Sequence, residues 1–286
     1  MKTLLVTGAN GFTGRHLIPA AAALGYNPYA LTANLIDAEA VAAEVTNIMP
    51  SHVIHLAGIS AITHADEMEI YRVNLFGTIN LLKALAALPY TLNKVLLTSS
   101  ANIYGSGATS PISEASCPAP VNHYATSKLA MEHMALTFAS KLPIVIARPF
   151  NYTGVGHDKR FVIPKLTWHF AQRTPTIALG NLHVEREFND VRTVCSAYIK
   201  LLEFGRLGQA YNICSGKAVN LQAVFDILSN LTGHKPTIEV NPAFIRQNEI
   251  PYLYGSPSKL EACIGKLVYP ALQETLLWML ESVKND

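Results

Sequence analysis

The chain has 286 residues, half of them hydrophobic, and a formal net charge of +2. This length and apolar fraction predict a folded globular protein with one large domain or two interleaved ones, and they exclude a disordered chain. Because the net charge is small and no long basic run occurs, the sequence has no electrostatic signature of binding to nucleic acid or to an acidic membrane.

The cysteines and the apolar runs limit the class further. The four scattered cysteines are Cys117, Cys195, Cys214 and Cys263. No pair has the spacing of metal ligands or of a disulfide framework, so we expect reduced thiols and no metal site. The first predicted strand begins at Lys2, which leaves no room for a signal peptide, and no apolar run reaches the ~20 residues needed to cross a bilayer. We therefore expect a cytoplasmic protein without a membrane partner.

The N-terminus carries a strand, a glycine-rich turn and a helix in the order that a dinucleotide-binding fold requires. Residues 2–7 form a short apolar run, the turn is Gly8-Ala9-Asn10-Gly11-Phe12-Thr13-Gly14, and a helical run follows from Arg15. Gly8 permits the tight turn, Gly11 leaves space for a pyrophosphate, and Gly14 lets the helix approach the strand. The start of the helix offers unpaired N–H groups to phosphates.

Strands and helices continue to alternate through the first half of the chain. Further strands are predicted near 29–31, 52–56, 95–98 and 144–148, and helices near 38–45, 74–82 and 124–128. After Pro149 the pattern loosens, with a helix near 188–204, a strand near 211–214 and helices near 221–231 and 272–283. Repeated β-α-β units predict an α/β fold of the Rossmann type, a doubly wound parallel sheet with helices on both faces.

The change of pattern after Pro149 suggests two parts. We expect residues 1–153, with 188–217 returning to them, to form a dinucleotide-binding domain. Residues 154–187 and 218–286 are then a smaller C-terminal substrate lobe over the carboxyl edge of the sheet, which would create a cleft for a second ligand.

Tyr124 and Lys128 are four residues apart on a predicted helix, so their side chains share one face. An ammonium group beside a phenol lowers the phenol pKa from its usual value near ~10. A tyrosine tuned in this way can exchange a proton with a sugar hydroxyl or ketone. Ser100 follows the strand at 95–98, where its hydroxyl could bond a substrate oxygen. Each feature alone also fits a plain surface pair or a structural turn.

Taken together, three motifs resemble the extended short-chain dehydrogenase/reductases of the NAD-dependent epimerase/dehydratase family. They are Thr7-Gly8-x-x-Gly11-Phe12-x-Gly14, Ser100 with Tyr104-Gly105, and Tyr124-x-x-x-Lys128. Within the family, segments 148–151, 161–163 and 211–216 look most similar to the GDP-4-keto-6-deoxymannose reductases.

The resemblance implies a set of site residues. The implied catalytic residues are Ser100, Tyr124, Lys128 and Asn74. The implied cofactor-binding residues are Gly8, Asn10, Gly11, Phe12, Gly14, Arg15, Asn34, Leu35, Leu56, Ala57, Gly58, Tyr124, Lys128 and Pro149. The implied substrate-binding residues are Ser100, Asn102, Asn151, Arg186, Arg246 and Glu249. For Arg186, a solvated ion pair within Glu185-Arg186-Glu187 is the alternative.

The chain departs from the family pattern at two places. Dehydratases carry an acidic residue at the position of Asn102, and an amide cannot protonate a leaving hydroxyl, which argues against a 4,6-dehydratase. No acidic residue stands near Thr32 or Ala33, where one would bind the ribose diol of NAD and repel the phosphate of NADP. With Arg15 close in sequence, we expect NADP(H) to be favoured and NAD(H) to be accepted as well.

The implied reaction is NAD(P)H-dependent reduction of the 4-keto group of a nucleoside-diphosphate 4-keto-6-deoxy sugar, with a GDP-linked substrate favoured. The nearest alternative is a nucleoside-diphosphate-sugar 4-epimerase that keeps NAD bound, because it uses the same serine, tyrosine and lysine. A non-catalytic dinucleotide-binding sensor is a remote alternative. The family resemblance also implies a homodimer formed through the helices that carry Asn74 and Tyr124.

Overall fold

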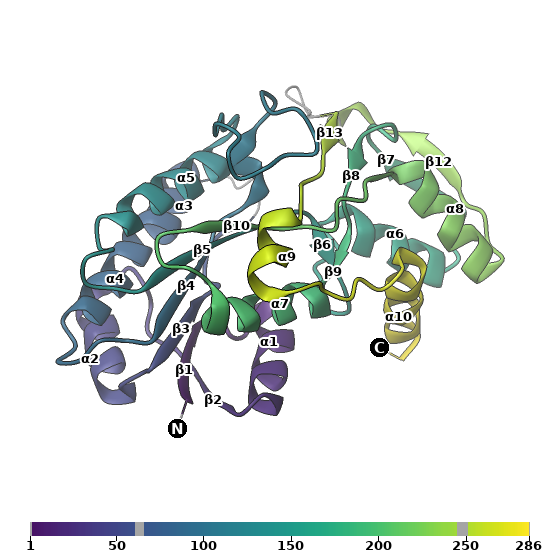
Figure 1. The fold of residues 1–286 in the computed structure, drawn as a ribbon. Helices are drawn as coiled ribbons and strands as arrows, with labels where there is room; N and C mark the ends of the chain where they lie inside the picture. The colour runs from purple at the N-terminus through teal and green to yellow at the C-terminus, as the bar shows by residue number, and fades with distance from the viewer. Residues whose placement is uncertain (1, 61–65, 245–250, 286) are drawn as a thin grey trace.

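The computed structural model describes residues 2–60, 66–244 and 251–285. Its centre is a six-stranded sheet in the order β10-β5-β4-β3-β1-β2, in which every neighbouring pair is parallel (Figure 1). The strands are β1 (Lys2–Thr7), β2 (Tyr26–Ala30), β3 (His52–His55), β4 (Lys94–Thr98), β5 (Ile144–Pro149) and β10 (Ala210–Ile213). The predicted doubly wound α/β fold of the Rossmann type is confirmed.

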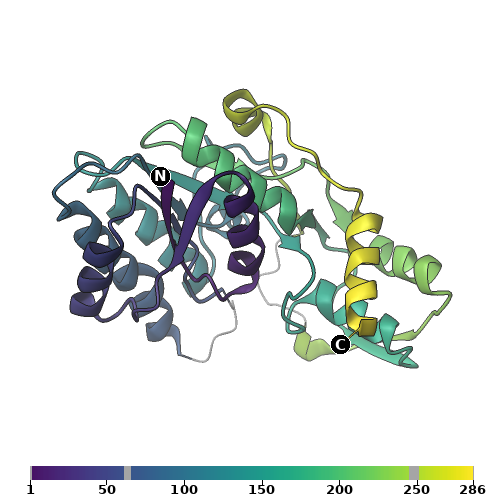
Figure 2. The ribbon, with the colours of Figure 1, turned by 90° about the horizontal axis from the view of Figure 1, so that it is seen from below.

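Helices cover both faces of this sheet (Figure 2). One face is covered by α1 (Phe12–Ala23) and α7 (Val191–Phe204), and the other by α2 (Ala38–Ile48), α4 (Thr78–Ala86) and α5 (His123–Leu136). Side chains alternate along each strand, so neighbouring residues enter different cores. Leu4 and Val6 pack with α1 and α7, whereas Leu5 packs with α2 and α4.

The strand order reverses beside β1, because β2 lies on one side of it and β3, β4 and β5 follow on the other. Ligands of open α/β sheets bind at the carboxyl ends of the strands where the order reverses. In this chain, the turns after β1, β3, β4 and β5 therefore meet at one edge. They begin at Gly8, Leu56, Ser99 and Phe150.

The predicted helix at 74–82 is interrupted. A short helix, α3 (Glu67–Tyr71), leads into a π-helical turn, η1 (Arg72–Gly77), before α4 begins at Thr78. A π-helical turn contains one extra residue, which changes the direction of the side chains in it. Asn74 lies in this turn and is buried.

The C-terminal part has a hydrophobic core of its own, formed by residues of α6 (Val162–Ala171), α8 (Leu221–Thr232), α10 (Leu272–Asn285) and β7 (Thr176–Leu179). Figure 1 shows it to the right of the main sheet. β12 (Thr237–Val240) pairs with β7, and a second small sheet has the order β11-β8-β13. Its strands are β11 (Val219–Asn220), β8 (Glu185–Arg186) and β13 (Tyr252–Leu253).

Two boundaries differ from the prediction. The helix expected from Phe188 begins at Val191, because β9 (Asn189–Asp190) first pairs with β6 (Tyr152–Thr153). Within 218–286, α9 (Ser258–Ile264) packs against α7 and β10, and its Leu260 lies in the same core as Leu4. The predicted assignment of 218–286 to the lobe therefore does not hold for α9, and the rest of the domain division stays a prediction.

Across the three described ranges, each helix is either too short or too polar to pass through a bilayer.

Candidate active site

The glycine turn between β1 and α1 has the close packing that the sequence predicts. Gly8 has a φ of +67°, and a Cβ atom there would lie 2.8 Å from the backbone N of Ala57. At Gly14, a Cβ would lie 2.5 Å from the carbonyl oxygen of Gly8. Gly11 stands at the N-cap of α1 and has no side chain to occupy the helix start. The N–H groups of this helix start can therefore receive a phosphate, so the turn fits a dinucleotide pyrophosphate.

Phe12 of this turn and Arg15 just beyond it contact the segment 152–157, which follows β5. The ring of Phe12 stacks on His157 at a centroid distance of 4.3 Å and on Tyr152 at 5.9 Å. The Arg15 guanidinium donates a hydrogen bond to the carbonyl oxygen of Gly156 at 3.2 Å. Arg15 was predicted to attract a 2′-phosphate. This hydrogen bond instead holds it against the loop after β6, while Asn10 is exposed at the turn.

Ser100 lies directly beyond β4 and is 5% exposed. Its Oγ accepts hydrogen bonds from the backbone N of Asn102 at 3.2 Å and from Asn102 Nδ2 at 3.1 Å. A hydroxyl group has two acceptor lone pairs and one proton. With both lone pairs engaged, the proton of Ser100 is left to donate, and the Ser100 hydroxyl is close enough to Tyr124 to lower the pKa of that phenol.

Tyr124 lies in the first turn of α5, which begins at the N-cap residue Asn122. Burial raises the pKa of Tyr124, and the neighbouring Ser100 hydroxyl opposes this effect. The prediction that Lys128 lowers the pKa of Tyr124 is wrong for this structure. The reason is that burial has the larger effect and the opposing contribution comes from Ser100.

Lys128 follows one turn later on α5 and is 5% exposed. Its Nζ donates a hydrogen bond to the carbonyl oxygen of Thr98 at 2.9 Å, which anchors the ammonium at the end of β4. A Cβ atom on Gly58 would come within 3.2 Å of this Nζ, so the lysine head lies against the turn after β3. Burial lowers the pKa of Lys128 to about 8, although the nearby Glu132 carboxylate raises it.

Asn74 braces the backbone beside the lysine. Its Oδ1 accepts from the N–H of Ile59 at 2.7 Å, and its Nδ2 donates to the Ile59 carbonyl at 3.1 Å and to Ser127 Oγ at 3.1 Å. These contacts fix the turn after β3 to α5. They give Asn74 a positioning role among the described residues, and its predicted part in catalysis stays a prediction.

A buried polar network beneath Lys128 was not predicted from the sequence. Glu132, one further turn along α5, accepts two hydrogen bonds from the Arg148 guanidinium, at 3.0 and 2.6 Å. Arg148 also donates to the hydroxyl of Tyr104 at 2.8 Å, and this hydroxyl donates to Asn212 Oδ1 at 2.8 Å. The network ties α5, which carries Tyr124 and Lys128, to β5, to β10 and to the turn after β4.

The predicted substrate residue Arg186 lies on β8, and its Nη1 donates to the carbonyl oxygens of Glu185 at 2.9 Å and Pro251 at 3.3 Å. The next residue, Glu187, is fully buried. It accepts hydrogen bonds from Asn189, Ser215, Gly216 and Gly255. Burial raises the pKa of Glu187, and these hydrogen bonds oppose the effect. The buried Glu187 carboxylate therefore connects the end of β8 to the loops at Ser215–Gly216 and Gly255, and it is not part of a solvated ion pair.

The remaining residues predicted to bind cofactor or substrate differ in how deeply they are buried. Leu56 and Ala57 are half-buried beside the glycine turn, Pro149 is buried at the end of β5, and Asn151 is exposed. The side chain of Asn34 is exposed and accepts from the backbone of Ile36. Leu35 is 7% exposed and its side chain packs in the core against α2 and α4, so its predicted contact with the cofactor would have to come from its backbone and stays a prediction. Arg246 and Glu249 lie outside the described residues.

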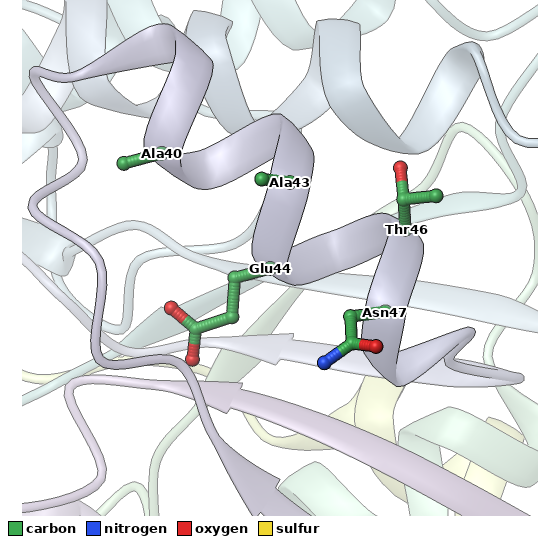
Figure 3. Close-up of a pocket in the computed structure, with 5 residues that line it drawn as sticks. All are labelled: Ala40, Ala43, Glu44, Thr46 and Asn47. Carbon is green, nitrogen blue, oxygen red and sulfur yellow. The ribbon is translucent and has the colours of Figure 1, made fainter.

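An acidic side chain that the sequence analysis missed lies at the end of β2. Glu44, on α2, extends from the helix toward the chain that follows β2 (Figure 3). Its carboxylate accepts from the backbone N of Thr32 at 2.8 Å and of Ala33 at 2.7 Å. The premise that no acidic group lies near Thr32 is therefore wrong. It failed because the carboxylate comes from a residue twelve positions further along the chain.

The parallel sheet, the glycine turn and the Ser100–Tyr124–Lys128 arrangement define a dinucleotide-binding α/β enzyme. The family model of the NAD dependent epimerase/dehydratase family matches residues 4–214. The chain belongs to this family of extended short-chain dehydrogenase/reductases, and it is an NAD(P)-dependent oxidoreductase.

The chain is also similar to individual members of this family. The chain is 33% identical to GDP-6-deoxy-D-talose 4-dehydrogenase of Aggregatibacter actinomycetemcomitans, over 92% of this chain and 91% of the relative. It is 34% identical, with the same coverage of both chains, to GDP-6-deoxy-D-mannose reductase of Pseudomonas aeruginosa. The solved structure of RMD from Pseudomonas aeruginosa complexed with NADPH matches 100% of this chain and 99% of its own, with 30% identity and a TM-score of 0.93.

Proposed function

We propose that the chain reduces the 4-keto group of a nucleoside-diphosphate 4-keto-6-deoxy sugar. The single observation that carries the proposal is the burial of Ser100, Tyr124 and Lys128 together, with Lys128 anchored at the end of β4, at the sheet edge that also holds the glycine turn. Two relatives above 30% identity are named for oxidoreductases of GDP-linked 6-deoxy sugars, which supports a GDP-linked substrate.

The chain's own residues supply binding and proton transfer. A bound nicotinamide dinucleotide would supply the hydride that the keto carbon requires. Ser100 donates a hydrogen bond to the substrate oxygen as negative charge develops on it. Tyr124 gives that oxygen a proton, and its raised pKa keeps it protonated and ready to act as the acid. Lys128, held at the Thr98 carbonyl, would bind the nicotinamide ribose.

The sugar nucleotide would lie between the sheet edge and the C-terminal lobe. Arg186 would bind its diphosphate from β8, since the fork of a guanidinium matches two phosphate oxygens. Asn102 and Asn151, which follow β4 and β5, would contact the sugar, and Arg246 and Glu249 stay predictions for the nucleotide. Binding energy from this remote part would orient the keto group.

The cofactor could be NADP(H) or NAD(H), and the sequence predicts a preference for NADP(H). A relative's structure with NADPH supports the phosphorylated form. Both sequence-based arguments for it have weakened, because Glu44 lies at the end of β2 and Arg15 contacts Gly156.

A 4-epimerase that retains NAD is the second candidate, and Glu44 is the observation that favours it. A carboxylate at this position suits the ribose diol of tightly held NAD. Gel filtration of the purified protein, followed by denaturation and chromatography of any released NAD or NADH, distinguishes the two. A reductase elutes without cofactor and an epimerase with it.

A homodimer also stays a proposal. Apolar side chains are exposed on the helices expected to pair: Met68 on α3, Phe76 on η1 and Met134 on α5 are 59%, 54% and 39% exposed. Their burial against a second copy would remove apolar surface from water.

The direct test is a product assay. GDP-4-keto-6-deoxymannose is incubated with the protein and NADPH or NADH, and the sugar product is identified by NMR. The proposal expects stoichiometric cofactor oxidation and a new hydroxyl at C4. Interconversion of a 4-hydroxy sugar nucleotide without net cofactor oxidation would contradict the reductase and support the epimerase.

A further inference from the structure

Glu44 closes a small anion-binding cradle. The cradle consists of the backbone N–H groups of Thr32 and Ala33 and the hydroxyl of Thr32. The two backbone groups bond different carboxylate oxygens, at 2.8 and 2.7 Å, and the hydroxyl lies 3.1 and 3.2 Å from them. Consecutive N–H groups that converge in this way also bind phosphate oxygens in other proteins.

The cradle lies next to the glycine turn. The backbone N of Leu31 donates to the carbonyl oxygen of Val6 at 2.9 Å, so the chain after β2 stays paired with the end of β1. Thr32, the next residue after Leu31, therefore lies near the end of β1. Gly8 begins the turn for the pyrophosphate at that same end. In a dinucleotide fold, the ribose hydroxyl that distinguishes NAD from NADP lies at the end of this second strand.

The surrounding charges favour a neutral ribose over a phosphorylated one. The sequence from Tyr26 to Ala38 contains no lysine or arginine. Arg15, the nearest arginine in sequence to the turn, donates to the carbonyl oxygen of Gly156 in the loop after β6. A 2′-phosphate placed here would meet the Glu44 carboxylate, and like charges at short range repel strongly when partly shielded from water.

We propose that Glu44 is the specificity-determining residue for the cofactor: its carboxylate fills the cradle, accepts the ribose 2′-hydroxyl and disfavours a 2′-phosphate. The assignment rests on the dinucleotide-binding function proposed above. It places the discriminating acid on α2 and not at the strand end itself, and it makes NAD(H) the better ligand.

The alternative is that Glu44 only holds the loop after β2. Isothermal titration calorimetry with ADP-ribose and with 2′-phospho-ADP-ribose separates the two roles, because neither probe needs the reaction. The test variant is Glu44→Gln, which removes the charge but keeps an oxygen for one N–H group. The matched control is Glu39→Gln, which removes the same charge from an exposed side chain on the same helix.

The expected result is that wild type binds ADP-ribose more tightly than its 2′-phosphate. Glu44→Gln should then shift the ratio of dissociation constants at least roughly tenfold toward the phosphorylated probe, and Glu39→Gln should leave it within about twofold. An equal change for both probes in Glu44→Gln, or no change, would overturn the assignment of Glu44 alone. Failure of wild type to bind ADP-ribose at all would overturn the dinucleotide site, and the proposed function with it.

Discussion

The two ends of the sheet edge are built differently. At the catalytic end, Ser100, Tyr124 and Lys128 are each less than one-tenth exposed and rest on the buried Glu132–Arg148 pair. At the end beside β2, Thr32 is exposed, and one half-buried side chain, Glu44, organises the loop. Reactive groups are thus fixed by the core, whereas cofactor choice depends on a surface contact. The second end can therefore be altered without unfolding the first.

The largest effect on stability is expected from breaking the buried network that ties α5 to β5, to β10 and to the turn after β4. Glu132→Ala leaves the Arg148 guanidinium buried without its partner carboxylate, which should lower the free energy of unfolding by about 3–5 kcal/mol. Urea unfolding followed by circular dichroism measures this change.

An exposed pair gives the matched control for that experiment. Asp158→Ala breaks an ion pair with Arg160 on the surface, and it should leave the free energy of unfolding nearly unchanged. Equal losses in the two variants would show that the buried network has no special role.

The pH dependence tests whether the Lys128 charge is used. Burial lowers the pKa of Lys128 to about 8, so the ammonium is present below pH 8 and is lost as the pH rises. Because the raised pKa of Tyr124 keeps it protonated over this range, kcat/KM should fall about tenfold per pH unit above 8. Lys128→Met should remove this fall in kcat/KM above pH 8. A wild-type kcat/KM that stays flat from pH 7 to 10 would contradict a role for the Lys128 charge.

A smaller effect is expected at Asn102, which orients Ser100. Asn102→Ala removes the Nδ2–H that engages one lone pair of Ser100 Oγ, so the serine proton is no longer directed only at Tyr124. We expect kcat to fall about tenfold, the equivalent of one hydrogen bond of ~1.4 kcal/mol, with a smaller rise in KM from the lost contact to the sugar. A rise in KM at constant kcat would contradict the orienting role and leave Asn102 with sugar binding alone.

The sequence predicted those parts of the site that depend on local order. The glycine turn follows β1 directly, and Tyr124 and Lys128 share a face because one helical turn separates them. Their positions could therefore be read before any tertiary contact was known. The parallel sheet followed in the same way from alternating strands and helices.

The missed features all depend on contacts between distant segments. Glu44 reaches the end of β2 from α2, and Glu132 meets Arg148 from another element. The π-helical turn at Asn74 has no signature in the periodicity of the sequence, and the packing of the Leu35 side chain in the core was not predicted either. The pKa of Tyr124 was predicted in the wrong direction because spacing reveals a neighbouring charge and not the depth of burial.

The central claim is that Tyr124 delivers the proton to the reduced keto group. Single-turnover kinetics of Tyr124→Phe with the 4-keto sugar nucleotide, alongside calorimetric binding of NADH, tests it most directly. The account predicts cofactor binding close to that of wild type and a rate of the chemical step lower by roughly 10²–10⁴. A rate within about threefold of wild type, with cofactor binding unchanged, would contradict it.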